Sequence, residues 1–153
     1  MTFEVRRLAS DDIAHAALLN GLFAKAFGDD ESYLSVPPRE AYFSRVLGRD
    51  TVIALVAMEG NELIGGLVAY VLDKLEQERS EIYIYDLAVA EDHRRGGVAT
   101  ALIGRLQQIA SDIGAWVVYV QADHGDDPAI ALYDKLGARE DVLHFDIPPA
   151  VIR

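Results

Sequence analysis

The sequence predicts an α/β domain built around a mixed β-sheet, and three features lead to this fold class. Apolar residues recur with period two in several short segments, as in β-strands, and at helical spacing in others. Glycine, proline and acidic clusters separate these segments, and no internal repeat interrupts them. The resulting order, β-α-α-β-β-β-α-β-α-β, fits a layered domain with helices packed on a central sheet.

The N-terminal half is expected to hold two helices and three strands. Period-two alternation predicts the strands, and capping residues, glycine or proline bound the helices. The expected elements are a strand at 3–8, a helix N-capped by Ser10 and ending at Phe27, a polar loop at 29–38, a helix at 39–48, and a hairpin of strands at 51–59 and 63–72.

The C-terminal half alternates strands and helices. Its helices are amphipathic, and its strands are rich in β-branched and aromatic residues. The expected elements are a strand at 81–89, a helix from Gly97 to Ile113, a buried strand with Trp116 at 115–122, a helix at 126–137 with Asp127 as N-cap, and a last strand at 142–147.

Length and composition indicate one soluble, ordered domain. The 153 residues are 51% apolar and 25% charged, which is enough to bury a proper core. The absence of cysteine excludes disulfides, thiolate nucleophiles and cysteine metal sites. The first residues lack a signal-peptide pattern, and no apolar run approaches the roughly 18 residues of a membrane span, so a cytoplasmic location is expected.

The chain is strongly acidic, with 25 acidic against 14 basic side chains and a formal net charge of −11. Such a field repels nucleic acid and anionic membranes and attracts cations. The excess of acid therefore either serves solubility or favours a cationic small molecule or a basic protein tail as partner.

Two arginines and two glycines stand where a strand gives way to a helix, in residues 94–97. A helix start exposes backbone N–H groups, and glycine lets the backbone approach a phosphate closely. The stretch has neither the Walker spacing nor the G-x-G-x-x-G of a dinucleotide site. It is either an exposed helix cap or the binding turn for another phosphate-bearing ligand.

Three sequence motifs, one of which includes the turn at residues 94–97, resemble those of one superfamily. Arg94-x-x-Gly97-x-Ala99 resembles the R/Q-x-x-G-x-G/A signature of the GNAT acetyltransferase superfamily, in which this turn wraps the pyrophosphate of coenzyme A. Residues 85–89 resemble the family's fourth strand, whose splayed end pairs with the pantetheine arm. Residues 126–140 resemble its N-x-x-A-x-x-L-Y-x-K-x-G motif, with Asp126 where asparagine usually stands.

This resemblance covers nearly the whole chain and implies a GNAT fold. The implied architecture is a mixed, mostly antiparallel twisted sheet of six to seven strands with helices on both faces, in a single domain over 1–153. The implied cosubstrate is acetyl-CoA, and the implied cofactor-binding residues are Leu87, Ala88, Val89, Arg94, Arg95, Gly96, Gly97, Val98, Ala99, Thr100, Asp126, Ala129 and Tyr133.

Longer runs resemble the class I aminoglycoside 3-N-acetyltransferases. These runs lie at 27–33, 80–89, 93–103, 119–137 and 143–146. The resemblance implies transfer of an acetyl group from acetyl-CoA to the 3-amino group of a 2-deoxystreptamine antibiotic such as gentamicin, and a homodimer. The alternatives are an acetyltransferase for another polyamine or a basic protein N-terminus, and an acyl-CoA-binding module without catalysis.

Direct attack of the amine on the thioester is the economical mechanism for a chain without cysteine. Tyr133 matches the tyrosine of the L-Y-x-K pattern, which implies that it donates a proton to the leaving thiolate; alternatively it is a core tyrosine.

Asp86 is the candidate base. In strict alternation it shares a face with Ile82, Ile84 and Ala88, where an unpaired carboxylate is unfavourable. Either a β-bulge re-aims it into a cleft, or it is buried with a partner. The backbone N–H near Leu87 is the candidate donor to the thioester oxygen.

An acceptor with several ammonium groups requires carboxylates, although each acid singly can be a solvated or capping group. The expected acceptor-binding residues are Asp86, Asp123, His124, Asp126, Asp127, Asp29, Asp30 and Glu31. None of the four histidines has metal-ligand spacing, so no metal is expected. Tyr83 and Tyr85 are interpreted as core or interface packing.

Overall fold

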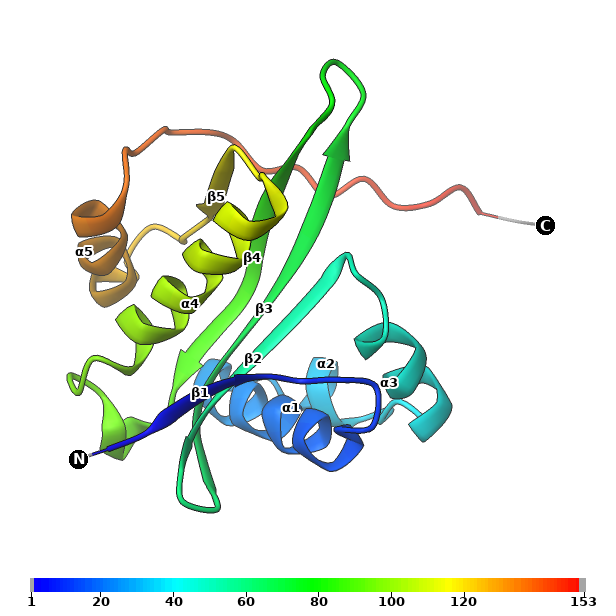
Figure 1. Cartoon of the computed structure of the whole chain (residues 1–153), viewed down its shortest axis with the longest axis vertical. Coiled ribbons are helices and arrows are strands. Elements are labelled where there is room, and N and C mark those ends of the chain that lie inside the picture. The colour runs from blue at the N-terminus through cyan, green and yellow to red at the C-terminus, as the bar shows by residue number, and fades with distance from the viewer. Residues whose placement is uncertain (1, 152–153) are drawn as a thin grey trace. The chain divides into compact units, whose positions relative to one another are not determined.

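The computed structural model describes residues 2–151 (Figure 1). The chain divides into two compact units, one ending at Gln121 and one starting at Ala122. The first unit holds the sheet and four of the helices. Its elements are β1 (Glu4–Arg7), α1 (Ile13–Phe27), α2 (Asp30–Leu34), α3 (Glu40–Leu47), β2 (Val52–Glu59), β3 (Glu62–Lys74), β4 (Arg79–Val89), the 3₁₀ turn η1 (Glu91–His93), α4 (Val98–Ile113) and β5 (Val117–Val120). The second unit holds α5 (Asp127–Leu136).

The five strands form one mixed sheet in the order β1-β2-β3-β4-β5. The strands β1 to β4 pair antiparallel in sequence, and β5 pairs parallel to β4. The α/β class and the mixed, mostly antiparallel sheet are therefore confirmed. The prediction of six to seven strands is wrong for the described residues, because residues 142–147 pair with no strand there and are exposed. Apolar and polar residues alternate in this segment, but alternation alone does not make a strand. The backbone N–H and C=O groups must also form hydrogen bonds with a neighbouring strand.

Helices cover both faces of the sheet. A Cβ placed on Gly65 of β3 would lie 2.8 Å from Val98 Cγ1 of α4, whereas one on Gly66 would lie 2.0 Å from Leu19 Cδ1 of α1. Neighbouring strand residues point to opposite faces, so α1 and α4 lie on opposite sides. Both glycines allow a helix to approach the strand closely. Ile53, Leu55, Leu67, Leu102 and Leu106 are completely buried.

Two details of the first helices differ from expectation. The N-cap of α1 is Asp12 and not Ser10, because the Asp12 carboxylate accepts hydrogen bonds from the Ala9 N–H (2.7 Å) and from Arg6 (3.1 Å) and closes the turn before the helix. The segment read as a polar loop contains α2, which Asp29 caps by accepting from the Ser32 N–H at 3.0 Å. A helix of five residues is too short to show a period.

The strand β5 is shorter than expected, which leaves Trp116 outside it. Trp116 was predicted to be buried, but it is 54% exposed, and the Arg79 guanidinium lies 4.1 Å from its ring centroid. The indole ring of Trp116 is thus covered by the side chain of Arg79 and is not packed in the hydrophobic core.

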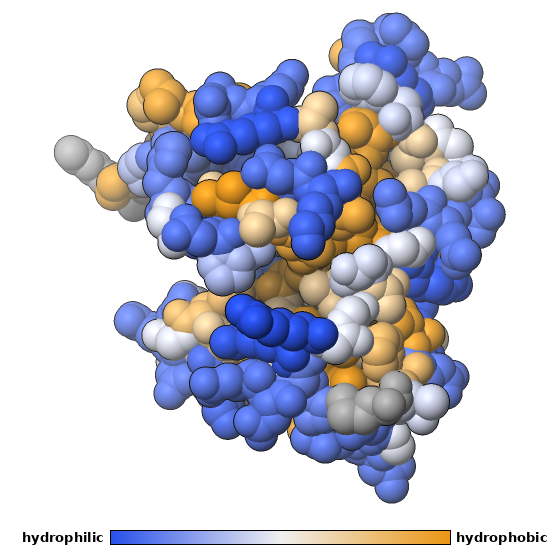
Figure 2. Space-filling model, turned by 90° about the vertical axis from the view of Figure 1, so that its left-hand side faces the viewer, coloured by the Kyte–Doolittle hydropathy of each residue, from blue (hydrophilic) through white to orange (hydrophobic). Residues whose placement is uncertain are grey.

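Hydrophilic side chains cover most of the face drawn in Figure 2. Among residues 2–151, no helix has both the length and the apolar character that a membrane crossing requires.

Candidate active site

A β-bulge in β4 decides where Asp86 points. Val68 of β3 pairs with Asp86, but the next residue, Ala69, pairs with Ile84, so Tyr85 is an extra residue in β4. Val68 and Ala69 face opposite sides of the sheet, and so do their partners. Asp86 therefore lies on the α1 face, away from Ile84. The expectation that strict alternation puts both on one face is wrong, and the bulge named as one alternative is confirmed.

The second alternative, a partner for the carboxylate, is also confirmed. Tyr33 of α2 donates its hydroxyl to Asp86 Oδ1 at 2.5 Å. Burial raises the pKa of Asp86 above its usual range, and the Tyr33 hydrogen bond acts in the opposite direction. The pKa of Tyr33 is itself raised, mainly by burial and then by the Asp86 carboxylate, so its phenol stays a donor. Tyr33 was not among the predicted site residues, although it ends one of the runs that carry the narrower resemblance.

Tyrosines extend the Asp86 face across three strands. Tyr70, Tyr83 and Tyr119 are register partners on β3, β4 and β5, and the rings of Tyr83 and Tyr119 stack with centroids 4.8 Å apart. The bulged Tyr85 packs edge-on against Tyr70 at 6.0 Å and Tyr83 at 5.7 Å. Tyr85 is 63% exposed. This group of four, called the tyrosine face below, is therefore not core packing, which was one of the two interpretations of Tyr83 and Tyr85.

The pairing between β4 and β5 stops at Ile84 and Val120, while β4 continues to Val89. The Ala90 N–H bonds to β3 through Ile64 O at 2.8 Å, so by alternation the N–H of Leu87 points to the opposite edge. Within the described residues no strand pairs with that edge beyond Ile84. The structure thus leaves the Leu87 N–H free to donate, one residue from Asp86.

The turn before α4 has the backbone of an anion site. Gly97 caps the helix in the left-handed conformation (φ 80°), and Arg95 is the one non-glycine residue of the described chain with positive φ (67°). Residues 94–97 are exposed, and the first N–H groups of α4, from Val98, Ala99 and Thr100, have no partner within the helix. The Arg94 Nε donates to Val89 O at 3.2 Å, which ties the turn to the end of β4. This donor set fits a pyrophosphate.

The remaining predicted residues lie in two segments. Asp30 and Glu31 are exposed at the start of α2, directly after Asp29. In the second unit, Asp123, His124, Asp126 and Asp127 are exposed, Ala129 is half-buried, and Asp126, rather than Asp127, is the N-cap of α5, since the helix begins at Asp127 with Pro128 in its first turn. Tyr133 is half-buried on α5, and burial, followed by the Asp126 carboxylate, raises its pKa.

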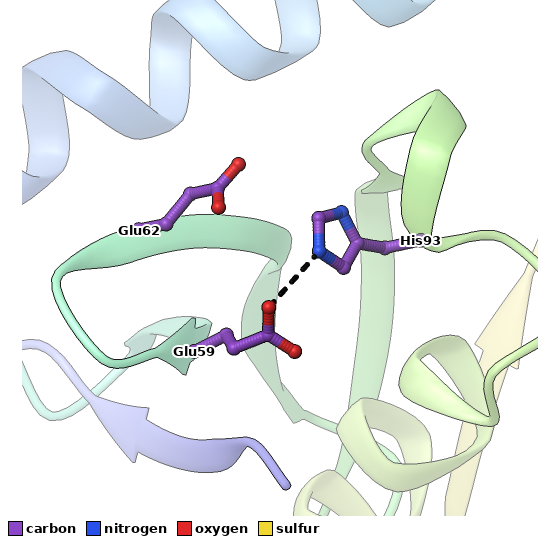
Figure 3. Close-up of side chains that lie close together, drawn as sticks. All are labelled: Glu59, Glu62 and His93. Atoms are coloured by element: carbon purple, nitrogen blue, oxygen red, sulfur yellow. Dashed lines mark hydrogen bonds and ion pairs between the residues drawn. The ribbon is translucent and has the colours of Figure 1, made fainter. Parts of the chain in front are cut away.

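The fold also brings together a group that the sequence did not suggest. One oxygen or nitrogen each from Glu59, Glu62 and His93 lie within 4.8 Å of one another, and His93 Nε2 is 3.4 Å from Glu59 Oε1 (Figure 3). Glu59 and Glu62 flank the β2–β3 turn, and His93 directly precedes Arg94. The contact between His93 and Glu59 therefore links the β2–β3 hairpin to the turn before α4.

Comparison with known proteins identifies the family. The model of the acetyltransferase (GNAT) family matches residues 17–138. The chain belongs to this family. It is accordingly an acetyl-CoA-dependent N-acetyltransferase.

Three relatives of this GNAT protein are informative. Its structure resembles an aminoglycoside acetyltransferase, HMB0005, from an uncultured soil metagenomic sample, with a TM-score of 0.96 and 53% identity over 98% of this chain and 100% of that chain. It also resembles the aminoglycoside acetyltransferase meta-AAC0020 from an uncultured soil metagenomic sample, solved with sisomicin, with a TM-score of 0.89 and 31% identity over 97% of each chain. An N-alpha-acetyltransferase of Saccharolobus solfataricus is 26% identical over 90% of this chain and 81% of that protein.

Proposed function

We propose that this protein is an aminoglycoside 3-N-acetyltransferase, which moves the acetyl group of acetyl-CoA to the 3-amino group of a 2-deoxystreptamine antibiotic. The observation that carries the proposal is the 53% identity, over 98% of this chain and the whole of the other, to an aminoglycoside acetyltransferase of the same fold. The net charge of −11 suits a polycationic acceptor. The proposal includes growth protection against such antibiotics, a homodimer, and a single domain over 1–153.

Bound acetyl-CoA supplies a thioester whose carbonyl carbon the acceptor amine attacks in a ternary complex. The N–H groups at the start of α4, with Arg94, Arg95, Gly96 and Gly97, hold the pyrophosphate. The backbone of Leu87, Ala88 and Val89 pairs with the pantetheine arm. The Leu87 N–H donates to the thioester oxygen as negative charge develops there.

Asp86 accepts a proton from the acceptor nitrogen. The neutral amine attacks with its lone pair, and as the C–N bond forms an N–H bond breaks, its electron pair stays on nitrogen, and the proton moves to the carboxylate. Its partial burial favours this role, because a raised pKa makes the carboxylate a better proton acceptor near neutral pH. Tyr133 gives a proton to the departing sulfur; the raised pKa of this phenol keeps it protonated until then.

Carboxylates bind the other ammonium groups of the acceptor. Asp29, Asp30 and Glu31 offer an acidic segment at α2, next to Tyr33. Acids also gather with His124 before and at the start of α5, at Asp123, Asp126 and Asp127.

Turnover with gentamicin and sisomicin tests the proposal. We expect acetyl-CoA consumption, a mass increase of one acetyl group, and an NMR shift at the 3-amino nitrogen. Asp86→Asn should lower kcat/KM by about 10²- to 10⁴-fold, since it removes the proton acceptor and keeps the shape of the side chain. Tyr133→Phe should lower kcat without changing the affinity for coenzyme A. Wild-type protein that acetylates no 2-deoxystreptamine compound would exclude this function.

A basic protein N-terminus is the second candidate acceptor, since the chain is 26% identical to an N-alpha-acetyltransferase. Peptides with free α-amino groups, offered in the same assay, separate the two candidates. Turnover of such peptides without turnover of gentamicin or sisomicin would favour this second candidate.

The cofactor turn has its own test, Gly97→Ala. At φ 80° an alanine is strained by about 1–2 kcal/mol, so the turn should lose its form and the affinity for coenzyme A should fall by about tenfold. The matched control is Gly104→Ala in the middle of α4, where an added Cβ meets nothing within 4 Å and should stabilise the helix by about 0.5–1 kcal/mol. Isothermal titration calorimetry measures the affinity of each variant for coenzyme A, and Gly104→Ala should keep the affinity of the wild type. Equal affinities in the two variants would contradict the proposed turn.

A further inference from the structure

Only one oxygen of the Asp86 carboxylate has a hydrogen-bond partner among the described residues. Its Oδ1 accepts the short hydrogen bond from Tyr33, whereas Oδ2 makes no hydrogen bond with any described residue and is not a buried atom. The two oxygens are therefore inequivalent, and Oδ2 is the one without a hydrogen-bond partner among the described residues.

Tyr33 is itself fixed by aromatic packing. Its ring centroid lies 5.9 Å from that of Phe23 and 5.8 Å from that of Phe27, which stack on each other along α1. Phe23 is only 1% exposed, so one side of this contact belongs to the core. The Asp29 cap orders the helix that carries Tyr33. The hydroxyl thus approaches Asp86 from a ring with little freedom to turn.

We propose that Tyr33 is a positioning residue: its hydroxyl holds Oδ1 of Asp86 and so presents Oδ2 as the atom that takes the proton of the acceptor amine. This proposal rests on the role proposed for Asp86. In the step, the lone pair of the amine forms the C–N bond, an N–H bond of that nitrogen breaks with its electron pair left on nitrogen, and the proton moves to Oδ2. The C–S bond breaks with its electron pair on sulfur, while the Tyr33 phenol keeps its own proton and remains the donor to Oδ1.

The hydrogen bond from Tyr33 also counters the effect of burial on the pKa of Asp86. Burial favours the protonated, inactive form of Asp86, and a donor to the ionised form favours the carboxylate. No lysine or arginine within residues 2–151 forms an ion pair with Asp86 to do this instead. The titratable groups that face Asp86 or Tyr33 are hydroxyls and one acid, namely Tyr70 of β3, Tyr83 and Tyr85 of β4, and Asp29 before α2.

The same short helix connects this bond to acceptor binding. Asp30 and Glu31 stand three and two residues before Tyr33 on α2, and both are exposed. An ammonium group of the acceptor bound by these two carboxylates would contact the same helix whose Tyr33 orients Asp86.

The test compares Tyr33→Phe, which keeps the ring against Phe23 and Phe27, with Tyr42→Phe, which removes a hydroxyl from exposed Tyr42 of α3. The protein is labelled with ¹³C at the aspartate carboxyl carbons, the Asp86 signal is assigned by its absence in Asp86→Asn, and the signal is titrated without substrate. We expect Tyr33→Phe to raise the pKa of Asp86 and Tyr42→Phe to leave it unchanged.

Kinetics on the same variants give the second readout. The acidic limb of kcat/KM should move to higher pH in Tyr33→Phe, with a loss of about tenfold to a hundredfold on that limb and recovery as the pH rises. An unchanged titration of Asp86, or a loss that is equal at every pH, would overturn the positioning role. If the wild type turns over no aminoglycoside but Tyr33→Phe still shifts the titration of Asp86, the proposed function is wrong and the effect of Tyr33 on Asp86 is confirmed. If the wild type turns over aminoglycosides but the titration does not shift, the proposed function is supported and the positioning role of Tyr33 is wrong.

Discussion

The strand β4 has two different faces. Toward α4 it presents Ile82 and Ile84, which are at most 3% exposed, under a helix whose Leu102 and Leu106 are completely buried. Toward α1 and α2 it presents Tyr83 and, after the bulge, Asp86. One face is dry and aliphatic, while the other combines partial burial with hydroxyls and a carboxylate.

The two faces differ in the roles we assign to them, since we propose catalysis only for the face that holds Asp86. Burial of aliphatic side chains against α4 stabilises the fold without specific polar contacts. On the opposite face the same strand holds a partly desolvated carboxylate, which the folded state tolerates because Tyr33 donates to it. The bulge at Tyr85 separates these roles, because it changes the face of every residue that follows.

The largest expected effect on stability lies on the aliphatic face. Leu102→Ala should lower the free energy of unfolding by about 2–5 kcal/mol, because it opens a cavity beside Gly65. Urea denaturation measures this loss. The control on the same helix is Ile113→Ala, 48% exposed, with an expected change within about 0.5 kcal/mol. If the two variants unfolded alike, the assignment of α4 as the stabilising side of β4 would be wrong.

A smaller effect is expected on the tyrosine face. Tyr85→Ala should raise the KM for an aminoglycoside by about twofold to fivefold, the worth of one exposed cation–π contact, and leave the KM for acetyl-CoA unchanged. Tyr85→Phe keeps the ring and should keep most of the affinity. A KM that does not respond to loss of the ring would mean that the acceptor does not touch this face.

The smallest expected effect is a pH-dependent gain in stability. The pKa of Asp86 is higher in the folded than in the unfolded chain, so the wild type loses some stability as the pH rises through the folded pKa. Asp86→Asn has no charge to desolvate and should melt at a slightly higher temperature at pH 7 to 8. The difference should vanish below the unfolded pKa of about 3.9. Melting curves across this pH range give the sign, and a variant that is less stable at pH 8 would show that the carboxylate stabilises the fold.

Much of the fold follows from local patterns. The end of α1 and both ends of α4 follow from helical spacing and from glycines at 28, 97 and 114, all with positive φ. The hairpin turn at Gly60 likewise follows from local residue preferences. Patterns of this kind could not reveal α2, which is too short for a period, or show that residues 142–147 lack a partner within the described residues.

The sequence by itself determined the family, and it led to the proposals of a cofactor turn around Gly97 and of Asp86 as the base, because these depend on residues close together in the chain. Only the tertiary structure decided which way Asp86 points and what holds it. The bulge arises from the pairing of β4 with β3, and Tyr33 meets Asp86 across 53 residues of chain. Contacts between distant segments depend on how elements pack, and a local pattern of residues contains no record of that packing.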